Sequence, residues 1–152
     1  MKWYHEANVW KDVAYRGVRT LKLPSDMWNY QEILFAHGIE RVIETGSRHC
    51  GSALFFADLM PADGQARVVS IDLMPELDPR AARDDRIQFI TGDSGDPALA
   101  ERVMSQLPSD RGKVFLILDS DHAASHVRRE LDAWAPLLRS GDYLVVEDTI
   151  VN

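Results

Sequence analysis

The decisive stretch of the sequence is residues 41–52, which read RVIETGSRHCGS. It opens with a short apolar run that predicts a buried strand over residues 41–44, and a helix is predicted over residues 52–60. Gly46 and Gly51 lie between the two and let the backbone turn sharply and approach a ligand closely. The spacing is neither that of a phosphate-binding Gly-Lys-Ser/Thr loop nor a complete G-x-G-x-x-G. The stretch therefore predicts a strand, a glycine turn and a helix at a ligand site.

The alternation of apolar runs and helices continues to the end of the sequence. Further strands are predicted over residues 68–72, 87–90, 114–118 and 143–146, and further helices over residues 97–107 and 126–138. Strands that alternate with helices imply right-handed crossovers and a parallel sheet, and continuous apolar runs suit strands that are buried on both faces. We therefore predict an α/β fold with a Rossmann-like, doubly wound, mostly parallel sheet in the strand order 3-2-1-4-5.

The first 38 residues are expected to form a helical segment that covers the site. An amphipathic helix is predicted over roughly the first 20 residues, and a second one runs from an N-cap at Ser25 to a C-terminal Gly38. Residues 39–152 then form the ligand-binding part of a single domain.

Composition narrows the function classes. The chain has 152 residues, of which 45% are hydrophobic, so it suits one domain with a real core and excludes a disordered chain. Its formal net charge of -7 argues against a nonspecific nucleic-acid binder. Cys50 is the single cysteine, and neither a signal peptide nor a membrane-spanning run is visible. We expect a cytoplasmic protein with no nucleic-acid or membrane partner.

Polar residues follow the first three predicted strands. Glu44 ends the first strand, and Asp72 ends the second, where a carboxylate can accept hydrogen bonds from both hydroxyls of a ribose. Gly92-Asp93-Ser94 follows the third strand and offers groups that can read an adenine edge. The alternative for each is an ordinary turn or a loop-capping residue.

The acids after the fourth and fifth strands form the sharpest cluster. Asp119-Ser120-Asp121-His122 and Glu147-Asp148 follow neighbouring strands, whose chains lie roughly 5 Å apart. Carboxylates this close cannot all stay ionised without a cation, and oxygen-rich ligation suits a hard divalent ion such as Mg²⁺. The alternative is a set of solvated strand-end acids and helix caps.

These motifs resemble a known family. Residues 44–52, Asp72 and residues 92–94 resemble the cofactor frame of class I S-adenosylmethionine-dependent methyltransferases. Residues 118–122, followed by residues 137–148, look like the metal-dependent O-methyltransferases. The pattern is most similar to the cephalosporin hydroxylase / rhamnosyl O-methyltransferase family of natural-product tailoring enzymes, over roughly residues 20–150.

The resemblance implies a role for each matching position. S-adenosylmethionine would be bound by Glu44, Gly46, Ser47, Gly51, Ser52, Asp72, Gly92, Asp93 and Ser94. Mg²⁺ or another hard divalent cation would be bound by Asp119, Glu147 and Asp148, with Asp121 as an alternative to Asp119. The catalytic base would be Asp121 or His122. The acceptor would be a hydroxyl group of a small molecule, such as a sugar or natural-product scaffold, and the expected assembly is a homo-oligomer.

Two rival functions stay open at this point. A nicotinamide-dependent Rossmann oxidoreductase would explain Asp72 but not the acids after the fourth and fifth strands. A noncatalytic S-adenosylmethionine-binding or dimerisation module would use the same frame without turnover. The resemblance also implies a seven-stranded sheet, whereas five strands are predicted here. We therefore expect either a truncated chain that lacks the C-terminal antiparallel strands or a second subunit that covers the edge strand.

Overall fold

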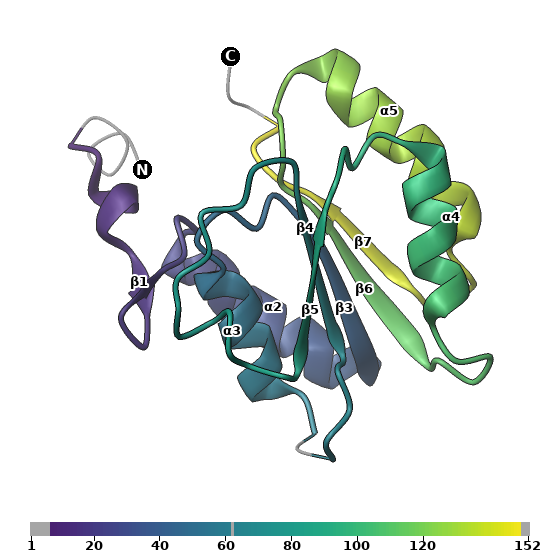
Figure 1. Cartoon of the computed structure of the whole chain (residues 1–152), viewed down its shortest axis with the longest axis horizontal. Coiled ribbons are helices and arrows are strands. Elements are labelled where there is room, and N and C mark those ends of the chain that lie inside the picture. The colour runs from purple at the N-terminus through teal and green to yellow at the C-terminus, as the bar shows by residue number, and fades with distance from the viewer. Residues whose placement is uncertain (1–6, 62, 150–152) are drawn as a thin grey trace.

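The computed structural model describes residues 7–61 and 63–149 (Figure 1). Its centre is a five-stranded sheet of β3 (Ile39–Thr45), β4 (Val68–Asp72), β5 (Ile87–Thr91), β6 (Lys113–Leu118) and β7 (Tyr143–Val146). The strand order is β5-β4-β3-β6-β7, and every neighbouring pair is parallel. In chain order this is 3-2-1-4-5, so the predicted sheet is confirmed. Val146 is the last strand residue in the described part of the chain.

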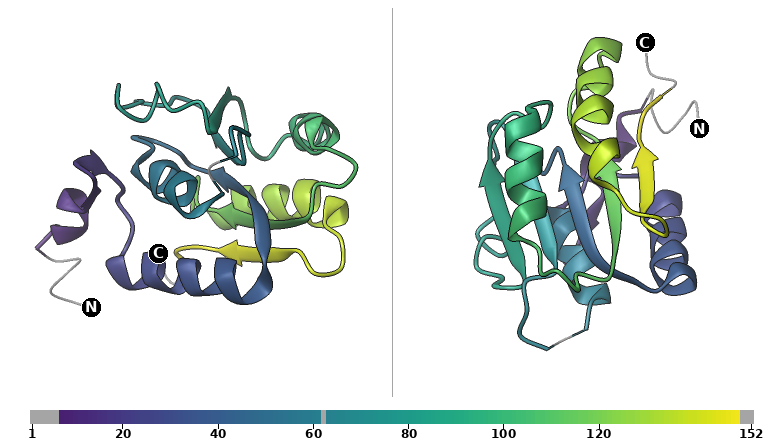
Figure 2. Two further views of the ribbon diagram at one scale, coloured as in Figure 1. Left: turned by 90° about the horizontal axis from the view of Figure 1, so that it is seen from below. Right: turned by 90° about the vertical axis from the view of Figure 1, so that its right-hand side faces the viewer.

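Helices cover both faces of the sheet (Figures 1 and 2). The helices are α2 (Pro24–His37), α3 (Gly51–Leu59), α4 (Pro97–Gln106) and α5 (Ala124–Trp134), and α5 continues into the 3-10 turn η2 (Ala135–Leu137). Alternate strand residues enter two separate cores: Val42 packs with α2 and α3, whereas Ile43 packs with α4 and α5. This double burial explains why the strands read as continuous apolar runs. None of the helices in the described ranges is both long and apolar enough to cross a membrane.

Helix α2 begins one residue before the expected N-cap. Pro24 is its first residue and Leu23 occupies the cap position, while Ser25 is already helical. The proline fixes a helical φ and lacks an N–H that the first turn would leave unpaired in any case. The expected end is confirmed, because Gly38 closes the helix with a φ of 60°.

The amphipathic helix predicted over the first 20 residues is wrong where the structure describes this segment, and residues 1–6 lie outside the described ranges. The segment forms a 3-10 turn, η1 (Val9–Asp12), and an antiparallel hairpin of β1 (Ala14–Tyr15) and β2 (Val18–Arg19). Arg16 and Gly17 connect the two strands with φ angles of 49° and 81°. Positive φ at both central residues is the geometry of a two-residue hairpin turn, whose twist matches that of the strands. The turn at Arg16 and Gly17 therefore forms a hairpin where the spacing of apolar residues had predicted a helix.

A buried ion pair joins β7 to the start of β6 at the end of the sheet opposite the strand-end acids. Arg111 and Asp142 have side chains that are only 2% and 3% exposed, and they form a two-pronged pair with N–O distances of 2.6 and 3.0 Å. Asp142 also accepts hydrogen bonds from the N–H groups of Val114 and Arg139. Burial alone would raise the pKa of Asp142, but these donors outweigh it and lower the pKa. The pair therefore aligns the edge strand with its neighbour.

Replacement of Asp142 by asparagine should reduce the free energy of unfolding by about 3–5 kcal/mol, because it leaves the Arg111 charge buried and unpaired. Since folding lowers the pKa of Asp142, this stability is present at neutral pH and is lost as acid protonates the carboxylate. Urea unfolding at several pH values measures both effects. The exposed Asp110→Asn variant is the control with the same charge change. Equal losses in the two variants would contradict the expected role of the pair.

Candidate active site

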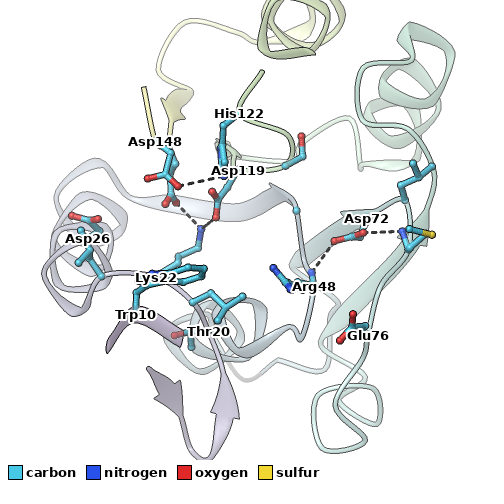
Figure 3. A pocket seen from close by; sticks show the side chains of 17 residues that line it. Trp10, Thr20, Lys22, Asp26, Arg48, Asp72, Glu76, Asp119, His122 and Asp148 are labelled. Atoms are coloured by element: carbon cyan, nitrogen blue, oxygen red, sulfur yellow. Dashed lines mark hydrogen bonds and ion pairs between the residues drawn. The ribbon is translucent and has the colours of Figure 1, made fainter. Parts of the chain in front are cut away.

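A cavity of about 600 Å³ lies at the carboxyl ends of the strands (Figure 3). One end is lined by Gly46, Arg48, Asp72, Leu73, Met74 and Glu76, which follow β3 and β4. The other end is lined by residues that follow β6 and β7, namely Asp119, Ser120, His122, Glu147 and Asp148. The N-terminal segment completes the wall with Trp10, residues 20–23 and Asp26. The cavity thus joins two of the predicted subsites in one space.

Asp72 lies in the cavity wall with its carboxylate fixed by the backbone. Its Oδ2 accepts a hydrogen bond of 2.8 Å from the N–H of Arg48, and its Oδ1 accepts one of 2.8 Å from the N–H of Met74. An ionised carboxylate can accept about four hydrogen bonds, so capacity remains for a ligand with two hydroxyls. The Arg48 side chain extends into the same end of the cavity (Figure 3).

Gly46 brings the ends of β3 and β6 into direct contact. Its φ is 82°, and a Cβ at this position would lie 1.9 Å from the carbonyl oxygen of Asp119. Two independent reasons therefore require glycine here: the positive φ, and the lack of space for a side chain. The contact places the glycine turn and Asp119 side by side at the middle of the cavity.

A lysine that was not predicted lies at the centre of the acidic cluster. The Nζ of Lys22 is 2.5 Å from Asp119 Oδ2, 2.6 Å from Glu147 Oε1 and 3.4 Å from Glu44 Oε1. The hydroxyl of Tyr30 also donates to Glu147 Oε1, at 2.7 Å. The cation that the crowded acids require is thus, in this structure, an ammonium group. The sequence feature that could have indicated this lysine is its position between Leu21 and Leu23, just before a proline.

Burial and the charge of Lys22 act in opposite directions on the pKa values of Asp119 and Glu44. Burial raises the pKa of Asp119 to about 6 and that of Glu44 to about 7, although Lys22 pulls both in the opposite direction. Burial alone would lower the pKa of Lys22, but Asp119, Glu147 and Glu44 together raise it well above its ordinary value. The ionised carboxylates and the ammonium therefore depend on each other.

The outer part of the cluster has the composition of a cation site. Asp119, His122 and Asp148 each offer one ligand atom, and these atoms lie within 4.8 Å of one another. His122 Nε2 lies 3.4 Å from Asp148 Oδ2. Carboxylate oxygens suit a hard divalent cation. The donor set therefore fits such an ion, although Lys22 engages Asp119 as well as Glu147 in this structure.

Four residues expected at the cofactor lie behind the cavity wall, since none of them lines the cavity. Glu44 is fully buried, and Ser47 and Ser52 are 4% and 3% exposed. Ser47 is hydrogen-bonded to Ser70. Gly51 lies under the hairpin, where a Cβ would be 2.4 Å from the carbonyl oxygen of Arg19. At Gly51 the absence of a side chain serves packing of the N-terminal segment on α3.

The residues after β5 are likewise placed outside the cavity lining. Asp93 forms an ion pair with Arg129 and accepts a hydrogen bond from the N–H of Gly95. The Ser94 hydroxyl lies 3.2 Å from His126 Nε2. A Cβ on Gly92 would meet Leu99 of α4 at 2.2 Å.

Asp121 is also absent from the cavity lining. It is exposed, and its Oδ1 accepts a hydrogen bond of 2.9 Å from the N–H of Ala123, just before α5 begins. The geometry therefore brings together Gly46, Asp72, Asp119, His122, Glu147 and Asp148 among the predicted site residues.

Comparison with known proteins identifies related sequences. A family model described as rhamnosyl O-methyltransferase/CmcI matches residues 7–152. Rhamnosyl O-methyltransferases of Mycobacterium tuberculosis and Mycobacterium leprae are 46% and 48% identical to the chain over 99% of its length. The chain spans 62% and 66% of the lengths of these two curated relatives.

Solved structures share the fold and part of the sequence. CmcI with Mg and SAM is 27% identical, with a TM-score of 0.69 over 91% of this chain and 58% of that chain. MycE methyltransferase from the mycinamycin biosynthetic pathway, in complex with Mg and SAH, is 27% identical, with a TM-score of 0.62 over 79% of this chain and 33% of that chain.

Replacement of Gly46 by alanine should destabilise the chain more than the same change at Gly64. Both glycines have a positive φ, but a Cβ on Gly64 meets nothing within 4 Å. Gly64→Ala should therefore cost only the conformational strain, about 1–2 kcal/mol. Gly46→Ala should cost about 1–3 kcal/mol more because it also collides with the backbone of Asp119. Urea unfolding compares the two, and equal costs would rule out the tight contact.

Proposed function

The chain belongs to the rhamnosyl O-methyltransferase/CmcI family. From that membership we propose that it transfers a methyl group from S-adenosylmethionine to a hydroxyl group of a sugar or natural-product scaffold. The reaction would use a divalent cation such as Mg²⁺. The observation that carries the proposal is the single cavity that holds both Asp72 and the acidic cluster. Relatives named for rhamnose methylation, and CmcI and MycE solved with Mg and SAM or SAH, support it.

The Asp72 end of the cavity is assigned to S-adenosylmethionine. Asp72 would accept hydrogen bonds from the ribose hydroxyls, and Gly46 would allow the methionine part to approach the backbone. Leu73 and Met74 are 64% and 81% exposed beside it and offer an apolar surface for the adenine ring. The Arg48 guanidinium would pair with the cofactor carboxylate. These residues replace most of the buried positions expected from the sequence.

The opposite end of the cavity is assigned to the cation and the acceptor. Asp119, Glu147 and Asp148 would bind the cation through carboxylate oxygens. When bound, a divalent cation lowers the pKa of a hydroxyl group that it contacts. Trp10, Leu21 and Leu23 line the cavity beside Lys22 and would contact the acceptor, so the N-terminal segment would cover this end.

His122 is the proposed base. It lines the cavity, and Asp148 beside it would orient the imidazole. His122 would take the proton of the acceptor hydroxyl, and the oxygen would attack the methyl carbon of the sulfonium. The carbon–sulfur bond breaks with its electron pair on sulfur, which leaves a neutral thioether. The cavity favours the reaction by holding the two reactants in line.

Methyl transfer is favoured over the two rivals for different reasons. A nicotinamide-dependent reaction gives the acidic cluster no role, and the family match points away from it. A noncatalytic binding module would use the Asp72 end alone and would bind S-adenosylmethionine without turnover. Cofactor affinity and Mg²⁺-dependent turnover separate these possibilities.

Asp72→Asn should weaken S-adenosylmethionine binding by about tenfold or more, because one anionic acceptor for the ribose hydroxyls is lost. Isothermal titration calorimetry measures the affinity. Asp85→Asn, an exposed change on the neighbouring loop, should leave it unchanged. The wild type is also titrated with NADH, and its affinity for NADH is compared with its affinity for S-adenosylmethionine. Tighter binding of NADH would favour the oxidoreductase.

Asp148→Asn should abolish the Mg²⁺ stimulation of methyl transfer while S-adenosylmethionine binding survives. Asp148 has a φ of 52°, and asparagine tolerates this conformation, so the backbone should be preserved. Asp119→Ala should have the same effect on turnover. Methylation of a panel of hydroxylated sugars and phenols, with and without Mg²⁺, measures it. Full activity of both variants in metal-free buffer would contradict the cation role.

A further inference from the structure

Lys22 reaches the acidic cluster from outside the sheet. It lies in the connection between β2 and α2, and its side chain extends into the cavity toward Asp119 (Figure 3). The side chain is only 2% exposed, although it carries a charge. Its three carboxylate partners, Glu44, Asp119 and Glu147, come from the ends of three different strands. A charged lysine is buried in this way only when anions compensate the lost hydration.

The ammonium engages two of the carboxylates that were predicted to bind the cation. It contacts Asp119 and Glu147 at 2.5 and 2.6 Å, which are the shortest of its three ion-pair distances. A divalent ion between the same two residues would lie against the ammonium. Two cations at that separation repel each other strongly in a site with little water. The two ions therefore exclude each other from these carboxylates.

The backbone next to Lys22 is held in an unfavourable conformation. Leu21 has a φ of 59°, a left-handed conformation that a bulky side chain rarely adopts. Such a conformation persists only where neighbouring contacts enforce it. The ion pairs of Lys22 are the strong contacts of this short connection, so their loss would allow Leu21 to relax.

We infer that the Lys22 ammonium occupies the place of a divalent cation between Asp119 and Glu147, and that it leaves both carboxylates when the cation binds. Lys22 is then a positioning residue that lowers cation affinity and holds the carboxylates of Asp119 and Glu147 together until the ion binds. Because Leu21, Lys22 and Leu23 line the acceptor end of the cavity, displacement of Lys22 reshapes that wall. The inference rests on the proposed function, which assigns a divalent cation to this site.

Direct titration of the protein with Mg²⁺ tests the competition. Lys22→Met removes the ammonium with little change in length, and Mg²⁺ should then bind at least about tenfold more tightly because the repelling charge is gone. Lys113→Met is the matched control: it removes the same charge near the start of β6, where Nζ donates to the carbonyl oxygen of His37. Its Mg²⁺ affinity should stay within about twofold of the wild type.

A second measurement uses the wild-type chain, so it does not depend on how well a variant folds. Acetylation of lysine amines, read by mass spectrometry, should modify Lys22 slowly in Na⁺ buffer, because its amine is buried and ion-paired. Saturating Mg²⁺ at the same ionic strength should increase the rate at Lys22 at least about tenfold and leave Lys113 unchanged.

The outcomes separate this inference from the proposed function. Mg²⁺ binding that is unchanged or weaker in Lys22→Met, or a Lys22 acetylation rate that saturating Mg²⁺ leaves unchanged, overturns the displacement of Lys22 alone. Absence of Mg²⁺ binding to both the wild type and Lys22→Met overturns the cation site itself, and the displacement with it.

Discussion

The structure depends on the meeting of several carboxylates at the carboxyl ends of adjacent parallel strands. Parallel pairing brings Glu44, Asp119 and Glu147 to the same edge of the sheet, and burial there raises the pKa of Glu44 and of Asp119. A cation is needed for the acids to stay charged, and Lys22 provides one. The N-terminal segment is thereby tied to the sheet by charge as well as by apolar packing. The same requirement makes this edge suitable for a divalent ion.

The sheet could be predicted from sequence because its physical cause is local. Strands buried on both faces need apolar runs, and such runs are visible in the three central strands β3, β4 and β6. The edge strands β5 and β7 are less buried, but their apolar residues still reveal them. The N-terminal hairpin could not be predicted in the same way. It consists of two two-residue strands whose turn depends on the backbone conformation of Arg16 and Gly17, and its stability comes from packing of Val18 into the core. Spacing alone does not reveal such a tertiary contact.

The site was predictable to the extent that strand ends determine it. Asp72, Asp119 and Asp148 follow strands and line the cavity as expected. Glu44 was expected at the end of its strand, but β3 continues to Thr45, and the Glu44 side chain is fully buried beside Lys22. Lys22 escaped prediction because two of its partners, Asp119 and Glu147, lie 97 and 125 residues further along the chain. Only the folded chain reveals that one apolar-flanked lysine compensates three distant acids.

The buried pair of Arg111 and Asp142 has a consequence at the opposite end of the molecule. In the described part of the chain β7 pairs only with β6, over four residues that run from Tyr143 beside Phe115 to Val146 beside Leu118. Glu147 and Asp148 directly follow this strand, so a slip of β7 by one position would move both residues along the edge of the sheet by about 3.3 Å. The ion pair prevents such a slip from the start of the strand. The positions of Glu147 and Asp148 in the cavity wall therefore depend on an ion pair at the far end of β7, a full strand length away.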